Sequence, residues 1–332
     1  MTRSDRAPGG PRRIVFQQRN PEEQKTQMNS RAVIWVTAAV FSMAVAGAAG
    51  AEEAEAPRAW DKPFTFSIDY TLVSDYVWRG INLSEYSGEG REKLNHQMTV
   101  GLSLDTEKLT GTDFGTLSGS FWFEWYAGQN DAAFGGGAHH LQEVDYTLSW
   151  SYDVPGTPVG VELGWIAYQF PWIAGDDAQW THEVYAAVSF DDSVLFGQPV
   201  LNPYFAYYLD LDDVRGSWME LGVSHDFAMS DCGLADTPVL KDVTVTPSLV
   251  LGIDHRYYDK GGVGASGSTG TRLGNLQYGL DVGLDLGSAL GLPEEYGALS
   301  LNGFLRYSQA FHDESSAVND EFWGGMTVGY EW

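Results

Sequence analysis

Apolar and polar residues alternate one by one along much of the chain after residue 63. In residues 275–286 an apolar side chain stands at every second position from Leu276 to Leu286, and Asn, Gln, Gly or Asp stands between them. A period of two indicates a β-strand with one apolar and one polar face. At about 3.3 Å per residue, this segment is longer than an average soluble strand and suits a tilted membrane strand.

The same pattern recurs in eleven other segments, separated by Gly, Pro, Asp, Asn and Ser clusters that are typical of turns. The predicted strands cover residues 64–80, 96–104, 116–126, 142–153, 159–169, 181–190, 201–210, 217–228, 243–258, 273–286, 298–311 and 321–332. The chain is therefore predicted to be all-β, with residues 64–332 forming a membrane-spanning antiparallel up-and-down β-barrel of about 12 strands.

A soluble β-sandwich or lipocalin-like barrel would show the same alternation with its faces reversed. Three features favour the membrane barrel: the even number of strands, a polar face crowded with Asp, Glu, Gly and Ser, and aromatic residues near the strand ends. These aromatic residues are expected on the lipid-facing side, as an interface girdle: Trp78, Trp125, Trp150, Tyr257 and Trp332.

The last predicted strand resembles the terminal signature of bacterial outer-membrane proteins. Phe322, Met326 and Val328 alternate with small or polar residues, and Tyr330 and Trp332 follow at the same spacing. In such proteins a final aromatic residue is read by the barrel-assembly machinery. Tyr330 and Trp332 are thus the expected assembly signal, with that machinery and outer-membrane lipid as partners.

The sequence pattern of residues 1–51 does not predict barrel strands. An apolar run over 32–48 follows Arg31, and Ala49-Gly50-Ala51 fits a signal-peptidase site. We expect an N-terminal extension, a start at Met28, cleavage near Ala51 and a short periplasmic lead over 52–63. The rival interpretation of the run is a transmembrane helix, but it has no basic stop-transfer flank.

Composition narrows the partners of the 332-residue chain. A single cysteine excludes an internal disulfide framework and a cysteine-built zinc site. Residues 1–51 hold seven basic and three acidic residues, which leaves 12 basic and 42 acidic residues and a formal charge of −30. A nucleic-acid partner is therefore not expected.

Residues 70–84 read Tyr-Thr-Leu-Val-Ser-Asp-Tyr-Val-Trp-Arg-Gly-Ile-Asn-Leu-Ser. Over about eleven residues, 74–84, this segment resembles the N-terminal motif of the TorF-type (Gcw_chp) outer-membrane porins, in which a Ser-Asp-Tyr strand continues into aromatic-Arg-Gly-Ile. The resemblance implies an outer-membrane barrel that forms a channel.

The chain shows no catalytic constellation. None of the seven histidines has a serine two residues further on, and no G-x-S-x-G elbow is present. His139-His140 and the carboxylates at 210, 212 and 213 lack a complete set of metal-ligand spacings. We predict no enzyme activity, no cofactor and no metal.

The polar face supplies the candidate functional residues. With the apolar face outward, the basic side chains Arg79, Arg256 and Arg306 point into the lumen from the first, ninth and eleventh predicted strands. Carboxylates are expected across from them on the third, fourth and sixth strands: Glu124, Glu143, Asp145 and Glu183. Opposed walls of this kind produce a transverse field that sets pore selectivity. The inward aromatic residues would fill the lumen or stack against a solute: Trp122, Tyr126, Tyr168, Tyr185, Tyr204 and Tyr208.

Two functional hypotheses follow. The first is an outer-membrane channel for passive diffusion of small hydrophilic solutes, with cation preference from the acidic lumen. The alternative is a non-conducting outer-membrane barrel with a filled lumen, acting as an enzyme or as a structural or surface protein. Strand number does not decide between them, because eight-stranded barrels are filled and sixteen-stranded ones conduct. The solute and the oligomeric state stay open.

Overall fold

The computed structural model describes residues 62–84, 94–127, 141–174, 177–212, 214–260, 270–311 and 319–332. The expected signal peptide, its cleavage site and most of the periplasmic lead lie outside these ranges. Among the described residues, no helix is both long and apolar enough to cross a membrane.

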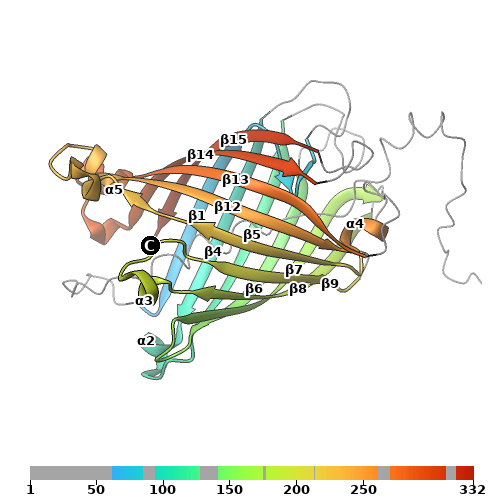
Figure 1. The fold of residues 1–332 in the computed structure, drawn as a ribbon, viewed down its shortest axis with the longest axis horizontal. Coiled ribbons are helices and arrows are strands. Elements are labelled where there is room, and N and C mark those ends of the chain that lie inside the picture. The colour runs from blue at the N-terminus through green and yellow to red at the C-terminus, as the bar shows by residue number, and fades with distance from the viewer. Residues whose placement is uncertain are drawn as a thin grey trace, which may run out of the picture.

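Twelve long antiparallel strands make up the described part of the chain (Figure 1). Their bounds are β1 Phe64–Val73, β4 Asn95–Asp105, β5 Thr116–Tyr126, β6 Leu141–Asp153, β7 Val159–Ala174, β8 Asp177–Phe190, β9 Tyr204–Asp210, β10 Ser217–Ser224, β12 Val243–His255, β13 Thr271–Asp285, β14 Ala298–Ala310 and β15 Glu321–Glu331.

Each long strand pairs with its neighbours in the chain, and the sheet closes on itself. The last strand returns to the first, where Ser67 pairs with Glu331 and Val73 with Gly325. The sheet order runs unbroken from β10 through β1 and β15 to β12, and β12 also pairs with β10. The predicted 12-stranded up-and-down barrel is confirmed.

Short elements lie at the two ends of the barrel. Those in the turns are α2 Thr106–Thr110, α3 Ser193–Phe196, β11 Phe227–Ala228, the π-helical turn η4 Ser230–Leu234, the 3-10 turns η5 Leu240–Asp242 and η6 Glu294–Tyr296, α4 Tyr257–Lys260 and α5 Leu286–Leu290. The C-terminus, α2, α3 and α5 lie at one end, which we name the terminal end, and α4 lies at the other, the α4 end (Figure 1).

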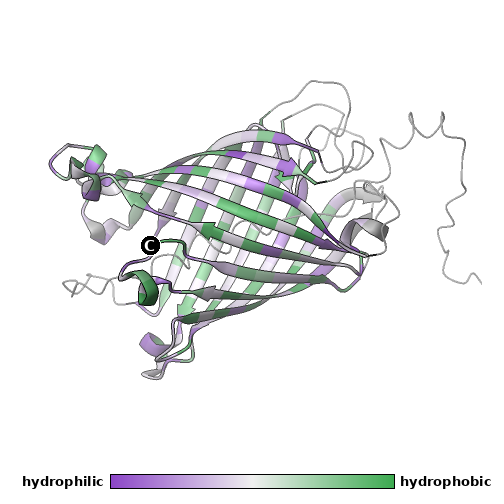
Figure 2. Cartoon of the chain, viewed as in Figure 1, coloured by the Kyte–Doolittle hydropathy of each residue, from purple (hydrophilic) through white to green (hydrophobic). Residues whose placement is uncertain are grey.

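The two faces of the wall differ in chemistry, as the alternation predicts. Leu221, Leu280 and Leu305 are 47%, 40% and 49% exposed on the outside. Apolar and polar residues alternate along most strands in Figure 2. Inside, toward the terminal end, small polar residues line the wall, and the hydroxyl of Ser103 lies 3.0 Å from that of Ser118 on the next strand. The apolar face therefore points outward.

Several predicted strands end earlier than the alternation suggests, and two of these early ends change where a predicted site residue lies. The first stops at Val73 instead of continuing to residue 80, and the ninth stops at His255 instead of residue 258. Arg79 and Arg256 lie beyond these ends with φ of 46° and 60°. Such left-handed backbone cannot continue a strand, so neither arginine projects from the wall as predicted.

Candidate functional site

A short hairpin folds into the barrel directly after β1. Its strands are β2 Val77–Trp78 and β3 Ile81–Asn82, which pair with each other and form a sheet separate from the wall. Arg79 and Gly80 make the turn, and both have positive φ, of 46° and 84°. This is the backbone of a two-residue hairpin turn with left-handed central residues, for which glycine is well suited.

Residues at the base of the hairpin form hydrogen bonds with its backbone amide and carbonyl groups. The Tyr76 amide donates to the Ser84 hydroxyl at 2.7 Å, and the Leu83 amide donates to the Tyr76 carbonyl at 2.7 Å. The Asn82 side chain donates to a carboxylate oxygen of Asp75 at 3.1 Å. These bonds replace the ladder that β1 would need to continue, so the chain leaves the wall after Val73 and turns inward.

The hairpin is tied to the wall by a buried ion pair. Arg79 donates from its two terminal nitrogens to the two carboxylate oxygens of Glu183 on β8, at 2.9 and 3.1 Å. The two side chains are 2% and 0% exposed. The hydroxyls of Tyr168 and Tyr257 each donate to Glu183 at 2.6 Å. Glu183 thus accepts four hydrogen bonds, which offset the cost of burying its charge.

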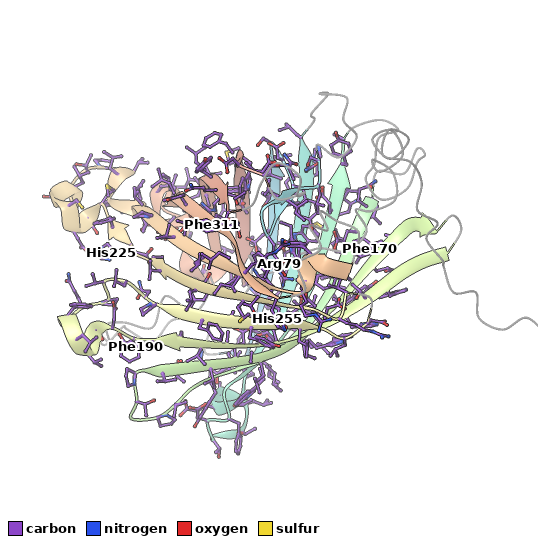
Figure 3. The ribbon with its side chains drawn as sticks, turned by 45° about the vertical axis from the view of Figure 1, so that its right-hand side comes forward. Arg79, Phe170, Phe190, His225, His255 and Phe311 are labelled. Carbon is purple, nitrogen blue, oxygen red and sulfur yellow. The ribbon has the colours of Figure 1, made fainter. Side chains whose placement is uncertain are left out.

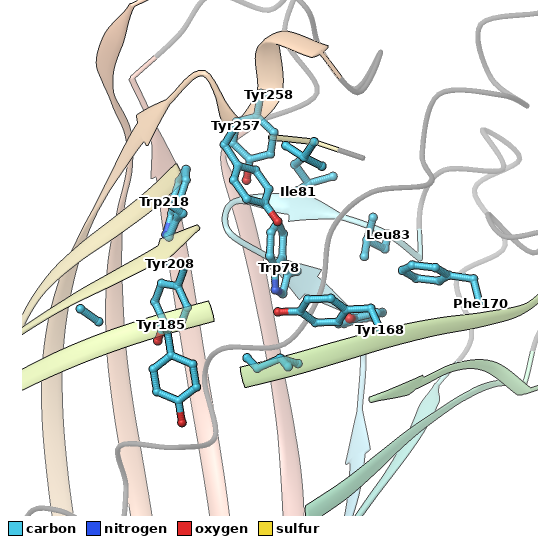
Figure 4. Packing of buried hydrophobic residues seen from close by; sticks show 14 of the residues in the cluster. Trp78, Ile81, Leu83, Tyr168, Phe170, Tyr185, Tyr208, Trp218, Tyr257 and Tyr258 are labelled. Carbon is cyan, nitrogen blue, oxygen red and sulfur yellow. The ribbon is translucent and has the colours of Figure 1, made fainter. Parts of the chain in front are cut away.

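Aromatic rings enclose the Arg79 guanidinium. Its central carbon lies 4.1 Å from the ring centroid of Trp78, 4.6 Å from Tyr257, 4.8 Å from Tyr208 and 5.7 Å from Trp218. Each distance is within the range at which a cation is attracted to a ring face. Figure 4 shows these rings close together at the α4 end, and Figure 3 places Arg79 beside α4.

A second set of carboxylates lies on neighbouring strands. Glu124 on β5 pairs in register with Glu143 on β6, and Asp145 lies two residues further along β6. All three are buried. The Tyr76 hydroxyl of the hairpin base donates to Glu143 at 3.2 Å. The structure therefore brings the predicted carboxylates 124, 143 and 145 together against the hairpin, and places Glu183 at its tip.

The predicted opposition of a basic and an acidic wall is wrong in its geometry. Arg79 belongs to the hairpin and contacts Glu183 directly. Arg306 does lie on the wall, where it pairs at 2.8 Å with Asp281 of the neighbouring strand rather than facing a distant carboxylate. Arg256 follows the end of β12. Arg79 and Arg306 are thus each paired with a nearby carboxylate, because a charge inside the barrel is stabilised most by a close partner.

The predicted lumen aromatics lie on the inner side of the barrel. Tyr168, Tyr185 and Tyr208 belong to one buried cluster around the hairpin, and Trp122 and Tyr204 pack against it. Tyr126 is buried at the end of β5. Whether these residues and the charged ones line a conducting path stays a prediction.

Two of the expected girdle residues are part of this cluster instead. Trp78 and Tyr257 are each 2% exposed, and their rings lie 5.6 Å apart. The predicted placement of Trp78 and Tyr257 on the lipid-facing side is wrong because both residues lie beyond the ends of β1 and β12. Beyond a strand end, alternation no longer indicates on which face of the barrel wall a side chain lies. The Arg79-Gly80 turn was the available signal, since it can reverse the chain immediately after Trp78.

The sequence analysis does not predict that Trp218 and Tyr258 belong to this cluster. Trp218 on β10 packs edge-to-face against Tyr258, which donates to the backbone carbonyl of Arg79 at 2.8 Å.

No group of three or more His, Cys, Asp or Glu side chains in the described ranges has an arrangement that could hold a metal ion.

No family model matches this chain, and no curated protein matches it. Among solved structures it is similar to the COG4313 outer membrane channel from Pseudomonas putida F1, at 9% identity and a TM-score of 0.46 over 83% of this chain and 97% of that one. It is also similar to the KdgM porin, at 10% identity and a TM-score of 0.38 over 80% and 98%. It is similar as well to Pseudomonas putida OprB, at 9% identity and a TM-score of 0.35 over 81% of this chain and 94% of that one. The TorF-type resemblance stays limited to residues 74–84.

Proposed function

We propose that this chain is an outer-membrane channel for the passive diffusion of small hydrophilic solutes, and that it prefers cations. The observation that carries the proposal is the contrast between the two faces of the closed barrel. The outer face is apolar, as a lipid-facing surface must be, whereas Ser and Thr hydroxyls and carboxylates lie on the inner face. A polar inner face of this kind suits a water-filled lumen.

The charge of the interior supports cation preference. Two of the arginines predicted to face the lumen are matched by nearby carboxylates, Arg79 by Glu183 and Arg306 by Asp281. Further carboxylates lie on the inward face beyond these pairs: Glu124, Asp145, Glu162 and Glu220. A carboxylate that is ionised in a narrow passage attracts cations and repels anions, with less screening than at the surface.

The test is the reversal potential of the refolded barrel in a planar bilayer under a salt gradient. The triple variant Glu124→Gln, Glu143→Gln, Asp145→Asn should shift the reversal potential toward the anion side. A matched control removes three exposed carboxylates from turns at the terminal end: Glu107→Gln, Asp231→Asn and Asp236→Asn. An equal shift in the two triple variants would contradict a lumenal origin of selectivity.

The buried hairpin favours a second candidate, a barrel whose lumen is filled and does not conduct. Its residues Trp78, Ile81 and Leu83 are almost fully buried, as in a packed core. Replacing residues 75–83 by a short Gly/Ser linker separates the two candidates. A wild-type barrel that conducts supports the channel. A silent wild type together with a conducting linker variant supports the filled barrel.

A further inference from the structure

The Arg79 guanidinium occupies a site that the barrel wall builds without it. Glu183 comes from β8, Tyr168 from β7, Tyr208 from β9, Trp218 from β10 and Tyr257 from α4. The occupant comes from the hairpin, about a hundred residues earlier in the chain. We propose that this wall site is a binding site for guanidinium-bearing solutes, and that Arg79 is its internal ligand in this structure.

The chemistry of the site selects a planar cation. The Glu183 carboxylate receives two parallel N–H bonds at 2.9 and 3.1 Å, which a guanidinium fork supplies and a single ammonium does not. Hydroxyls of Tyr168 and Tyr257 hold the carboxylate in place, each at 2.6 Å. Rings of Tyr208, Tyr257 and Trp218 flank the cation. A neutral planar analogue such as a urea could form hydrogen bonds but would gain neither the charge nor the cation–π attraction.

The hairpin that carries the internal ligand is itself packed into the interior, where Trp78, Ile81 and Leu83 are almost fully buried. The Tyr258 hydroxyl donates to the Arg79 carbonyl at 2.8 Å, and the Asn82 side chain donates to the Glu321 carboxylate at 3.3 Å. Arg79 also holds a left-handed φ of 46°, which is costly for a residue other than glycine. A tethered ligand competes at an effective concentration in the millimolar range for a short flexible tether, so free solutes compete poorly until Arg79 is removed.

The inference that guanidinium-bearing solutes are transported rests on the proposed channel function. Binding at the wall site does not, because a filled barrel would hold the same residues. The experiment therefore measures binding in detergent micelles and not conductance. Failure of conductance would leave the binding result intact, and failure of binding would leave the channel proposal intact.

The variant Arg79→Ala empties the site, and methylguanidinium is the probe. We expect millimolar methylguanidinium to change the tryptophan fluorescence of this variant saturably and to raise its thermal unfolding temperature, because Trp218 and Trp78 border the site. Methylurea, of the same shape without the charge, should do neither. The wild type should bind methylguanidinium at least about tenfold more weakly, since its own arginine competes.

Two further variants locate the effect. Adding Glu183→Gln to Arg79→Ala should abolish the response to methylguanidinium. Arg306→Ala removes another lumenal arginine whose partner Asp281 is only partly buried, and it should not create a response. The proposal is overturned by an equal response to methylurea, by a response that survives Glu183→Gln, or by no response in Arg79→Ala.

Arg79→Ala could fail to refold alone, and the refolding yield then becomes the readout. Methylguanidinium present during refolding should restore the folded fraction, and methylurea should not. Absence of rescue at every concentration below the denaturing range would overturn the proposal in the same way.

Discussion

Arg79 and Glu183, 104 residues apart in the chain, share two hydrogen bonds of 2.9 and 3.1 Å inside the barrel. This one contact joins the tip of the β2–β3 hairpin to the wall strand β8. Because both side chains are almost completely buried, neither charge can turn to water if its partner is lost. The pair therefore controls both the stability of the interior and the position of the hairpin.

Glu183→Gln should lower the free energy of unfolding by about 3–5 kcal/mol, because it leaves the Arg79 charge buried without its partner. Denaturant titration of the refolded barrel in micelles measures this. The control is Asp281→Asn, which breaks the Arg306 pair, whose side chains are 14% and 23% exposed. Solvent reaches that pair, so its loss should cost about 1 kcal/mol or less. Equal costs at the two sites would show that the Arg79 charge finds another partner.

An arginine introduced on the outer face of β13 should be far more harmful than one on the inner face. Leu280 is exposed on the outside, and Leu280→Arg should destabilise the barrel in lipid by about 2–4 kcal/mol if this position lies near the bilayer midplane. Gly283→Arg makes the same addition on the inward side of the same strand, where a new Cβ would find only the Asn302 side chain, 3.8 Å away. Folding titrations in lipid vesicles compare the two. Equal tolerance would mean that the lipid does not contact the outer face.

Trp332→Ala should reduce the amount of folded barrel in the outer membrane. The Trp332 backbone exchanges two hydrogen bonds of 2.8 Å with Phe66 at the seam between β1 and β15, and its ring lies 6.5 Å from that of Phe64. The backbone bonds survive the substitution, so the variant should refold in micelles almost as well as the wild type. Cell fractionation measures the first effect and refolding yield the second. Normal amounts in the membrane would contradict the predicted assembly role of the terminal aromatics.

Acid should erase the stabilisation that Asp192 provides at the turn between β8 and β9. Burial opposes ionisation of this carboxyl, but the Val200 and Leu201 amides donate to its two oxygens at 2.9 and 2.6 Å, and together such backbone bonds hold the pKa of Asp192 below its usual value. A lowered folded pKa means that the stabilisation is complete above the unfolded pKa of about 3.9 and is lost as the pH falls through the folded value.

Asp192→Asn should therefore cost the same free energy of unfolding at pH 7 as at pH 5, and progressively less below about pH 4. Denaturant titrations of the wild type and the variant across this range measure the difference. A difference that stays constant down to pH 3 would mean that the carboxylate charge contributes nothing at this turn.

The alternation of apolar and polar residues determined the barrel because it is a local property. Each strand such as β13 shows its own lipid-facing row, from Leu276 to Leu284, and twelve such rows leave an up-and-down barrel as the simplest arrangement. The same rule placed Glu124, Glu143, Asp145 and Glu183 inward, where the structure has them buried. All of this follows from the two-residue period of a strand.

Only the tertiary structure decided where residues 74–84 go. Continued alternation through Trp78 and Arg79 predicted a longer first strand, with a tryptophan toward lipid and an arginine facing a distant acidic wall. In the folded chain Arg79 pairs with Glu183, and Trp78 packs on Tyr257. Those partners lie more than a hundred residues away, so no local pattern could reveal them. The physical reason is that a buried charge must find its counter-charge wherever the fold brings one close, and that position is set by the closure of the whole barrel.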